Sequence, residues 1–187
     1  MEEEIRITVE YLKKGKVILY PTDTIWGIGC DATLPRSVDR IYKLKKRMES
    51  KSMIVLLDHP DKLVRFVKKV PPVAYDLIER YDEPLTIIYQ QAMNVAANVI
   101  AEDGTLAIRV VKDEFCRNMI SLFGKPVVST SANLSGEPAP ISFSKISEEI
   151  VSGVDHVVDY HRQNIIRTKP STIIRIMSNG EFEVIRK

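Results

Sequence analysis

The segment VVSTSANLSG (residues 127–136) changes abruptly from apolar to hydroxyl-rich. Its two valines are β-branched and favour a buried strand. Ser129, Ser131 and Asn133 favour turns and caps, because their short side chains bond nearby backbone. The segment therefore predicts a strand that ends in a polar turn. In open α/β sheets ligands bind in crevices outside strand ends, and small hydroxyl groups leave room for a ligand there. The alternative for a hydroxyl cluster that stands alone is a solvated turn before a helix.

Length and composition are those of one ordinary globular domain. The chain has 187 residues, 44% hydrophobic and 28% charged, with a formal net charge of +2. A chain of this length buries about 70% of its unfolded surface, so we expect a single domain over residues 1–187. No apolar run approaches the ~20 residues of a membrane span. The acidic start MEEEIRI is unlike a secretory signal, and Cys30 and Cys116 stand apart without the spacing of a zinc site or disulfide scaffold. We therefore expect a cytoplasmic protein that does not associate with membranes.

The other segments predict a mixed sheet. Strands are expected at residues 17–20, 25–30, 52–57, 84–89, 105–111, 154–160, 172–177 and 181–186. Helices are expected at residues 3–14, from 35 into the basic run at 43–51, and at 59–69, 73–80, 113–124 and 144–152. The Asn-Gly turn at 179–180 predicts a terminal hairpin. Strands and helices do not alternate strictly, so some neighbouring strands must be antiparallel. We expect one open, twisted α/β sheet with parallel and antiparallel strands, flanked by helices.

One run of cations and one isolated arginine are candidate binding residues. The basic run contains Lys43, Lys45, Lys46, Arg47 and Lys51. These side chains can form a basic cup if the preceding helix ends there, and otherwise they are a solvated helix face.

The second candidate is Arg109, which lies inside the otherwise apolar strand TLAIRVV. An arginine in a strand must find a partner or reach a cleft. A structural ion pair and a role in ligand binding are both open for it.

Common catalytic motifs are missing from the sequence. It has no G-x-x-x-x-G-K-[ST] loop and no G-x-G-x-x-G fingerprint, so side-chain cations and hydroxyls must hold any phosphate. No serine lies in a G-x-S-x-G motif. His59, His156 and His161 lack metal-ligand spacing. We expect each histidine to be a surface group or an internally hydrogen-bonded one.

Five motifs occur in an order and spacing that are known from one family. They are PTDTIWGIGCDA (21–32), IYKLKKR (41–47), LAIRV (106–110), KPVVSTSANLSG (125–136) and KPSTII (169–174). Together they resemble the YrdC/Sua5 family of threonylcarbamoyl-AMP synthases over about residues 15–175. The resemblance implies a YrdC-like fold in its short, single-domain form.

The resemblance implies a nucleotidyltransferase that joins L-threonine, bicarbonate or CO2, and ATP into threonylcarbamoyl-AMP and pyrophosphate. A downstream threonylcarbamoyl transferase complex then uses this product for the t6A modification at position 37 of tRNAs that read codons beginning with A. The reaction brings an N-carboxylate anion to the α-phosphate of ATP, so we expect fixed cations and Mg²⁺ to neutralise the phosphates. Positioning does most of the work, so neither a covalent intermediate nor a dedicated general base is expected.

The resemblance also implies roles for individual residues. The catalytic K-x-R and S-x-N motifs fall on Lys45, Arg47, Ser131 and Asn133. The residues implied to bind L-threonine are Thr24, Arg109, Ser129, Ser171 and Thr172, with Arg109 suited to its carboxylate. The residues implied to bind the nucleotide are Arg47, Lys51, Thr105 and Ser131. We expect Lys45 and Arg47 at the cleft surface, so that alanine at either position abolishes synthesis and leaves the fold intact.

The sequence departs from the family pattern at a few positions. Met48 and Leu56 stand where many relatives have proline and histidine, and Val111 stands where an R-x-P pattern has proline. The alternative function is a module that binds double-stranded RNA or tRNA through the same basic concave surface. The small net charge makes strong, sequence-independent RNA binding the weaker hypothesis.

Overall fold

The computed structural model describes residues 1–46, 53–162 and 170–187. Its strands are β1 (Ile18–Pro21), β2 (Trp26–Gly29), β3 (Ile54–Leu57), β4 (Leu85–Tyr89), β5 (Leu106–Val110), β6 (Val127–Ser131), β7 (His156–Val157), β8 (Thr172–Ile176) and β9 (Phe182–Arg186). The α-helices are α1 (Glu2–Lys13), α2 (Pro35–Leu44), α3 (Pro72–Arg80), α4 (Glu114–Phe123) and α5 (Glu148–Gly153). Short 3-10 helices are η1 (Pro60–Arg65), η2 (Ala97–Val99) and η3 (Phe143–Lys145).

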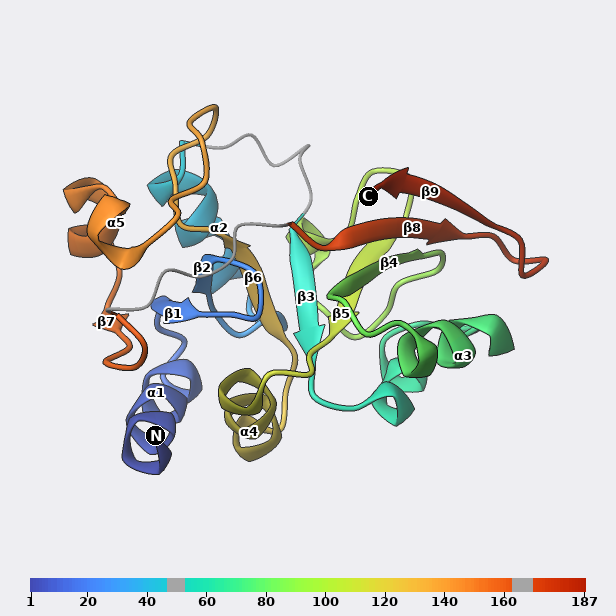
Figure 1. Cartoon of the computed structure of the whole chain (residues 1–187), viewed down its shortest axis with the longest axis horizontal. Coiled ribbons are helices and arrows are strands. Elements are labelled where there is room, and N and C mark those ends of the chain that lie inside the picture. Colours follow the sequence, from blue (N-terminus) through green and yellow to red (C-terminus); the bar gives the residue numbers. More distant parts are fainter. Residues whose placement is uncertain (47–52, 163–169) are drawn as a thin grey trace.

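The described strands form one sheet in the order β7-β1-β2-β6-β3-β5-β4-β8-β9 (Figure 1). The pairs β1/β7, β3/β5 and β4/β8 are parallel, and the other neighbours are antiparallel. This arrangement confirms the expected mixed sheet. The terminal hairpin of β8 and β9 is also confirmed, and Gly180 in its turn has a φ of 87°, which glycine adopts without strain.

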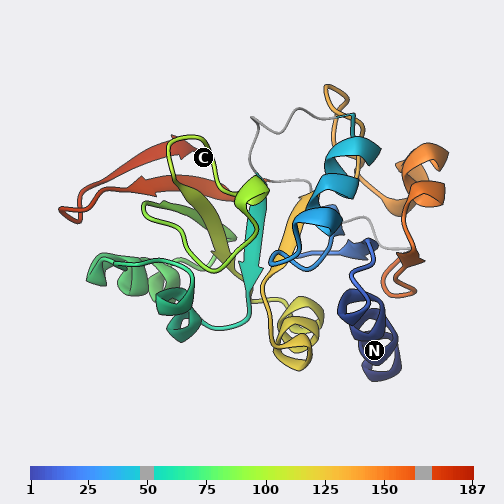
Figure 2. The ribbon, with the colours of Figure 1, turned by 180° about the vertical axis from the view of Figure 1, so that it is seen from behind.

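Both faces of the central strands are buried, because successive side chains of a strand point to opposite faces. On one face Leu56 and Val127 pack with α1 and α4, whereas Val55 and Val128 pack on the other face with α2 and the segments around α3. Figure 2 shows α1 and α4 side by side, and the two helices contact each other directly. These two helices cover only part of their face of the sheet, and the remaining part carries the candidate site.

Local capping explains why α4 begins and ends where the sequence predicts. The Asp113 carboxylate accepts a hydrogen bond from the Phe115 N–H at 3.0 Å, and Gly124 ends the helix with a φ of 77°. The helix turns its apolar side chains, including Met119 and Ile120, into the core. Its amphipathic pattern and its caps agree, so this element was predictable.

Three predicted elements differ in kind or extent. The helix expected at 59–69 is the short η1, because the chain leaves the helix at Phe66 and Val67 forms a β-bridge with Ala92. The helix expected at 144–152 is divided into η3 and α5 by Ser147, whose backbone is extended. The strand expected at 154–160 is limited to β7, because the N–H of Asp159 bonds the Glu4 carboxylate instead of a neighbouring strand.

Candidate functional site

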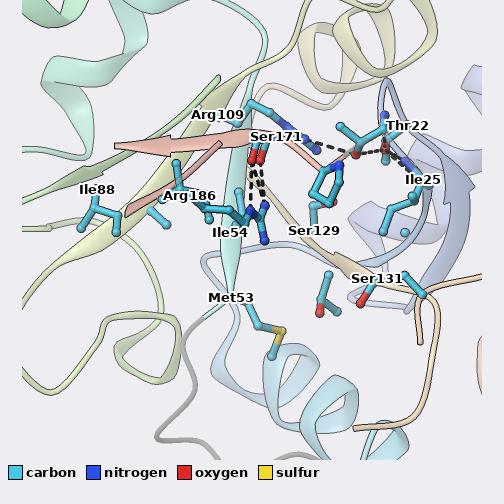
Figure 3. Close-up of a pocket in the computed structure, with 17 residues that line it drawn as sticks. Thr22, Ile25, Met53, Ile54, Ile88, Arg109, Ser129, Ser131, Ser171 and Arg186 are labelled. Carbon is cyan, nitrogen blue, oxygen red and sulfur yellow. Dashed lines mark hydrogen bonds between the residues drawn. The ribbon is translucent and has the colours of Figure 1, made fainter. Parts of the chain in front are cut away.

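A cleft of about 410 Å³ lies on the face of the sheet that α1 and α4 leave open (Figure 3). Arg109 is paired with Leu56 in the sheet register, and Ile54 is paired with Ser129. Because side chains alternate, Ile54, Arg109 and Ser129 point to the same face as Leu56. The sheet therefore supplies a rigid floor, and loops from both ends of the chain complete the walls.

One wall is the tight turn between β1 and β2. The Thr22 hydroxyl accepts hydrogen bonds from the N–H groups of Thr24 and Ile25, both at 3.2 Å, and donates to the carbonyl of Ile25 at 2.6 Å. These bonds fix the backbone of the turn, so that Thr24 is held against the cleft. The expected polar bend at residues 22–24 is confirmed as part of the cleft lining.

The end of β6 supplies the opposite hydroxyl groups. Ser129 and Ser131 line the cleft after Val127 and Val128 have entered the core, and Thr130 between them points its side chain to the other face. The change in polarity within this segment therefore marks a cleft, as the sequence predicts.

Arg109 crosses the floor of the cleft and is 3% exposed. Its Nη1 donates to the Thr24 hydroxyl at 3.3 Å, and its Nη2 lies 3.4 Å from Oδ1 of Asp23. Burial raises the pKa of Asp23, and the nearby charge of Arg109 opposes that rise. Both roles that the sequence left open, ion pair and cleft residue, are thus present in one side chain.

A second guanidinium, that of Arg186, reaches the cleft from β9. It donates from Nε and Nη2 to the Ser171 carbonyl at 3.2 and 2.9 Å, as Figure 3 shows. The Ser171 hydroxyl lies 2.9 Å from that of Thr86. Burial lowers the pKa of Arg186, and the positive charge of Arg109 lowers it further. The positive charges of the two arginines repel each other, so a bound anion would stabilise the charged form of both.

Sequence reasoning missed Arg186 as a site residue. Its position in an alternating edge strand makes it resemble an ordinary surface cation. Only the pairing of β9 with β8 brings its side chain to Ser171, and the sequence pattern carries no sign of that contact.

The structure corrects the expected place of Lys45, which is 1% exposed and lies away from the cleft surface. Its ammonium donates to the carbonyl of Ser131 and, at 2.5 Å, to that of Asn133. The N–H of Ser135 donates in turn to the Lys45 carbonyl at 2.8 Å. Helix α2 ends at Leu44, so the Lys45 side chain turns inward and ties the helix end to the turn after β6.

Other implied site residues lie beside the cleft rather than in it. The amide of Asn133 donates to the carbonyls of Leu134 and Glu137 at 2.9 and 2.7 Å, so it holds the loop after β6. The hydroxyl of Thr172 lies 2.9 Å from that of Tyr81, because alternation along β8 turns it away from Ser171.

Thr105 lines an adjoining hollow of about 270 Å³, and its hydroxyl donates to Asp103 at 2.6 Å. This hollow shares Ile88 and Ala107 with the cleft, so the two spaces are neighbours. Arg47 and Lys51 lie outside the described residues. Their roles stay predictions.

The remaining titratable groups do not add a second reactive centre. His156 bonds Glu4 at 2.9 Å and stacks on Tyr11, which agrees with the expected internal role. Burial raises the pKa of both Cys30 and Cys116, so their thiols are unreactive. Over the described ranges, no three His, Cys, Asp or Glu side chains gather as a metal site. In the same parts of the chain, every helix is too short or too polar to cross a membrane.

The basic run offers little free positive charge in the part that is described. Lys43 pairs with Asp39 at 2.7 Å, and Lys46 pairs with Glu149 at 2.9 Å. With Lys45 buried, the described cations at this end of α2, Lys43, Lys45 and Lys46, do not by themselves form an open basic cup. The observation does not favour the RNA-binding alternative.

Comparisons with known proteins agree with this geometry. The family model described as telomere recombination (Sua5, YciO, YrdC) matches residues 10–187. A threonylcarbamoyl-AMP synthase of Pseudoalteromonas translucida is 30% identical, and the match covers 97% of each chain. A threonylcarbamoyl-AMP synthase of Pyrococcus abyssi is 28% identical over 84% of this chain, but the match spans 47% of that longer relative.

Solved structures give the same result. The structure of P. abyssi Sua5 complexed with L-threonine has a TM-score of 0.89 and 26% identity, covering 100% of this chain and 54% of that one. Escherichia coli YciO, at 22% identity and with 90% of its chain covered, has a TM-score of 0.86 and supports the fold alone. With the family model matched over residues 10–187, the chain belongs to the Sua5/YciO/YrdC family.

Proposed function

We propose that the protein is an L-threonylcarbamoyladenylate synthase, which makes threonylcarbamoyl-AMP and pyrophosphate from L-threonine, bicarbonate or CO2, and ATP. The observation that carries the proposal is the chemistry of the cleft. Hydroxyl groups and two guanidinium groups line it, and none of its described lining residues is a carboxylate. Such a lining suits the carboxylate of L-threonine and the phosphates of ATP, which are the anionic groups of the reactants. A relative named threonylcarbamoyl-AMP synthase and the structure of P. abyssi Sua5 complexed with L-threonine support the same reaction.

The amino acid end of the cleft is the side where Arg109 meets the turn at residues 22–24. Nε of Arg109 is buried and has no hydrogen-bond partner among the described residues, so one donor of this cleft guanidinium is unsatisfied. The hydroxyls of Thr24, Ser129 and Ser171 surround the same space. We assign the carboxylate of L-threonine to Arg109 and its polar groups to these hydroxyls.

The reaction needs the neutral threonine amine to combine with CO2 to form an N-carboxylate, and the displaced N–H proton passes to solvent. Where bicarbonate is the carbon source, it takes up a proton and loses water to give CO2. One oxygen of that carboxylate attacks the α-phosphorus of ATP, and the bond between the α-phosphorus and the bridging oxygen of pyrophosphate breaks. Arg186 and Ser131 lie where they could bind phosphate oxygens, with Arg47, Lys51 and Thr105 added by the resemblance. Rate enhancement comes from holding these like-charged groups together against fixed cations.

Mg²⁺ is expected to arrive with the nucleotide. Hydroxyl and guanidinium groups are a poor donor set for Mg²⁺ on their own, whereas Mg²⁺ commonly binds substrate phosphates and keeps several waters. When bound, the ion would neutralise phosphate charge and the charge that develops on departing pyrophosphate. The cleft hydroxyls, including Ser131, could bind its waters.

The product would serve t6A modification at position 37 of tRNAs reading codons that begin with A. A cytoplasmic threonylcarbamoyl transferase complex would consume it, because a mixed anhydride of this kind is a reactive acyl donor. Direct binding of tRNA or double-stranded RNA is the alternative function, and the experiment described next distinguishes it from synthesis.

The test is pyrophosphate release from ATP with Mg²⁺ and bicarbonate, with and without L-threonine, followed by mass analysis of the nucleotide product. We expect release that depends on threonine, together with an adduct of the mass of threonylcarbamoyl-AMP. No turnover, alongside tight RNA binding at physiological salt, would replace the synthase with the RNA-binding function.

A further inference from the structure

Asp23 and Thr24 are neighbours in sequence but lie on different sides of Arg109. Thr24 lines the cleft, whereas Asp23 lines a second hollow of about 280 Å³ behind it, together with Asp82 and Asp113. The bonds of the Thr22 hydroxyl fix the turn that separates them. The backbone of one short turn therefore places a hydroxyl in front of Arg109 and a carboxylate behind it.

The contact between Asp23 and Arg109 is almost closed to solvent. The two side chains are 14% and 4% exposed, and Oδ1 of Asp23 lies 3.4 Å from Nη2 of Arg109. Among the described residues, Asp23 is the one carboxylate within ion-pair distance of Arg109. An arginine this deeply buried is costly unless its charge is compensated, and Asp23 supplies that compensation when the cleft is empty.

The placement of Asp23 also matters for ligand binding. A carboxylate inside the cleft would repel an anionic ligand, whereas Asp23 acts from the opposite side of the guanidinium. Thr24 accepts a hydrogen bond from one terminal nitrogen, Asp23 forms an ion pair with the other without a hydrogen bond, and Nε has no partner among the described residues. The hydrogen bond and the ion pair act on different terminal nitrogens, so together they restrain the orientation of the guanidinium.

We propose that Asp23 is a positioning residue for the amino acid substrate: it holds Arg109 from behind so that the guanidinium binds the substrate carboxylate in one geometry. This inference rests on the proposed function. It assigns Asp23 no contact with the substrate and no part in proton transfer. Its effect should therefore be specific to the carboxylate of the amino acid.

The test compares Asp23→Ala and Asp23→Asn with the unchanged protein. Binding of L-threonine, of L-threoninol (which lacks the carboxylate) and of ATP is measured by calorimetry, and KM values follow from pyrophosphate release. For Asp23→Ala we expect L-threonine binding to weaken by roughly tenfold to a hundredfold, the loss of one charge-assisted contact. Binding of L-threoninol and ATP should change by less than about twofold. Asp23→Asn keeps an oxygen acceptor, so its affinity for L-threonine should lie between that of the unchanged protein and that of Asp23→Ala.

The matched control is Asp82→Asn, which removes a carboxylate from the same hollow. It should leave all three affinities unchanged. Equal losses for threonine, threoninol and ATP would mean that Asp23 only supports the fold, and unchanged threonine binding in Asp23→Ala would also overturn the inference. If Asp23→Ala fails to fold, the threonine to threoninol ratio in Asp23→Asn decides. Failure of the unchanged protein to bind L-threonine would instead reject the proposed function, and the inference with it.

Discussion

Replacing Lys45 by methionine should destabilise the fold, although Lys45 belongs to a motif that resemblance assigns to catalysis. The Lys45 ammonium is buried and donates to the carbonyls of Ser131 and Asn133. Hydrogen bonds from a charged donor contribute about 1.5–3 kcal/mol each, so two amount to roughly 3–6 kcal/mol. Methionine avoids the desolvation of a buried ammonium, which offsets part of that loss. We expect a net loss of about 2–4 kcal/mol in the free energy of unfolding, or a fall in Tm of about 4–16 °C for a chain of this size.

The assay is urea unfolding followed by circular dichroism, with Lys43→Met as the control. The Lys43 side chain is 76% exposed and pairs with Asp39, so its loss should cost less than about 0.5 kcal/mol. A Lys45→Met protein no less stable than the Lys43→Met protein would refute the reasoning. In that case the buried Lys45 side chain would not stabilise the turn after β6, and the catalytic role that the resemblance implies for Lys45 would be favoured instead.

Three further changes test the packing, the pH dependence and the anion site. Gly29→Ala should cost several kcal/mol of stability by denaturant unfolding, because the added Cβ would lie 2.5 Å from the carbonyl oxygen of Val128. Burial alone would raise the pKa of Asp155, but the Arg40 hydrogen bond and other contacts hold it below its ordinary value of 3.8. A lowered folded pKa means that Asp155 stabilises the fold above the unfolded pKa and loses this effect as pH falls, so Asp155→Asn should flatten the loss of Tm below about pH 4. Arg186→Met should weaken ATP binding, measured by calorimetry, because the cleft loses one of the two cations among its described lining residues.

Each of these changes has a matched control. Gly27→Ala meets side-chain atoms at 3.3 Å and should cost less stability than Gly29→Ala. Asp61→Asn changes a carboxylate that is 82% exposed and should leave the acid dependence of Tm as it was. Arg6→Met removes a cation from the exposed side of α1 and should leave ATP binding unchanged. Equal effects in a variant and its control would contradict the corresponding prediction.

Local chemistry explains why much of the fold was predictable. The cap and the glycine of α4, the Asn-Gly hairpin, and the change from valine to hydroxyl residues in β6 each act within a few residues. The 3-10 helix η1 and the short β7 were not predictable in the same way. Their extent depends on which hydrogen-bond partners the rest of the fold offers to the residues that follow them.

The site was predictable in part, for the same reason. Arg109 stands out because a charge within an apolar strand requires an explanation, and the structure supplies both a partner and a cleft. The inward turn of Lys45 depends on where α2 ends relative to β6, which lies about 85 residues later in the chain. Arg186 reaches the cleft through strand pairing alone. Contacts set by tertiary structure leave little signal in the spacing of residues.

The order of the strands has a consequence for how the protein is made. Strand β8 inserts beside β4 with Leu85 paired to Thr172, and β9 then adds Arg186 at the outer edge. Pairings between such distant segments form slowly and late. A growing or partly folded chain can already have its β1–β2 hairpin, but it has no complete cleft until its last strands have docked. L-threonine and ATP would therefore bind only the finished fold, and would stabilise it against unfolding by mass action.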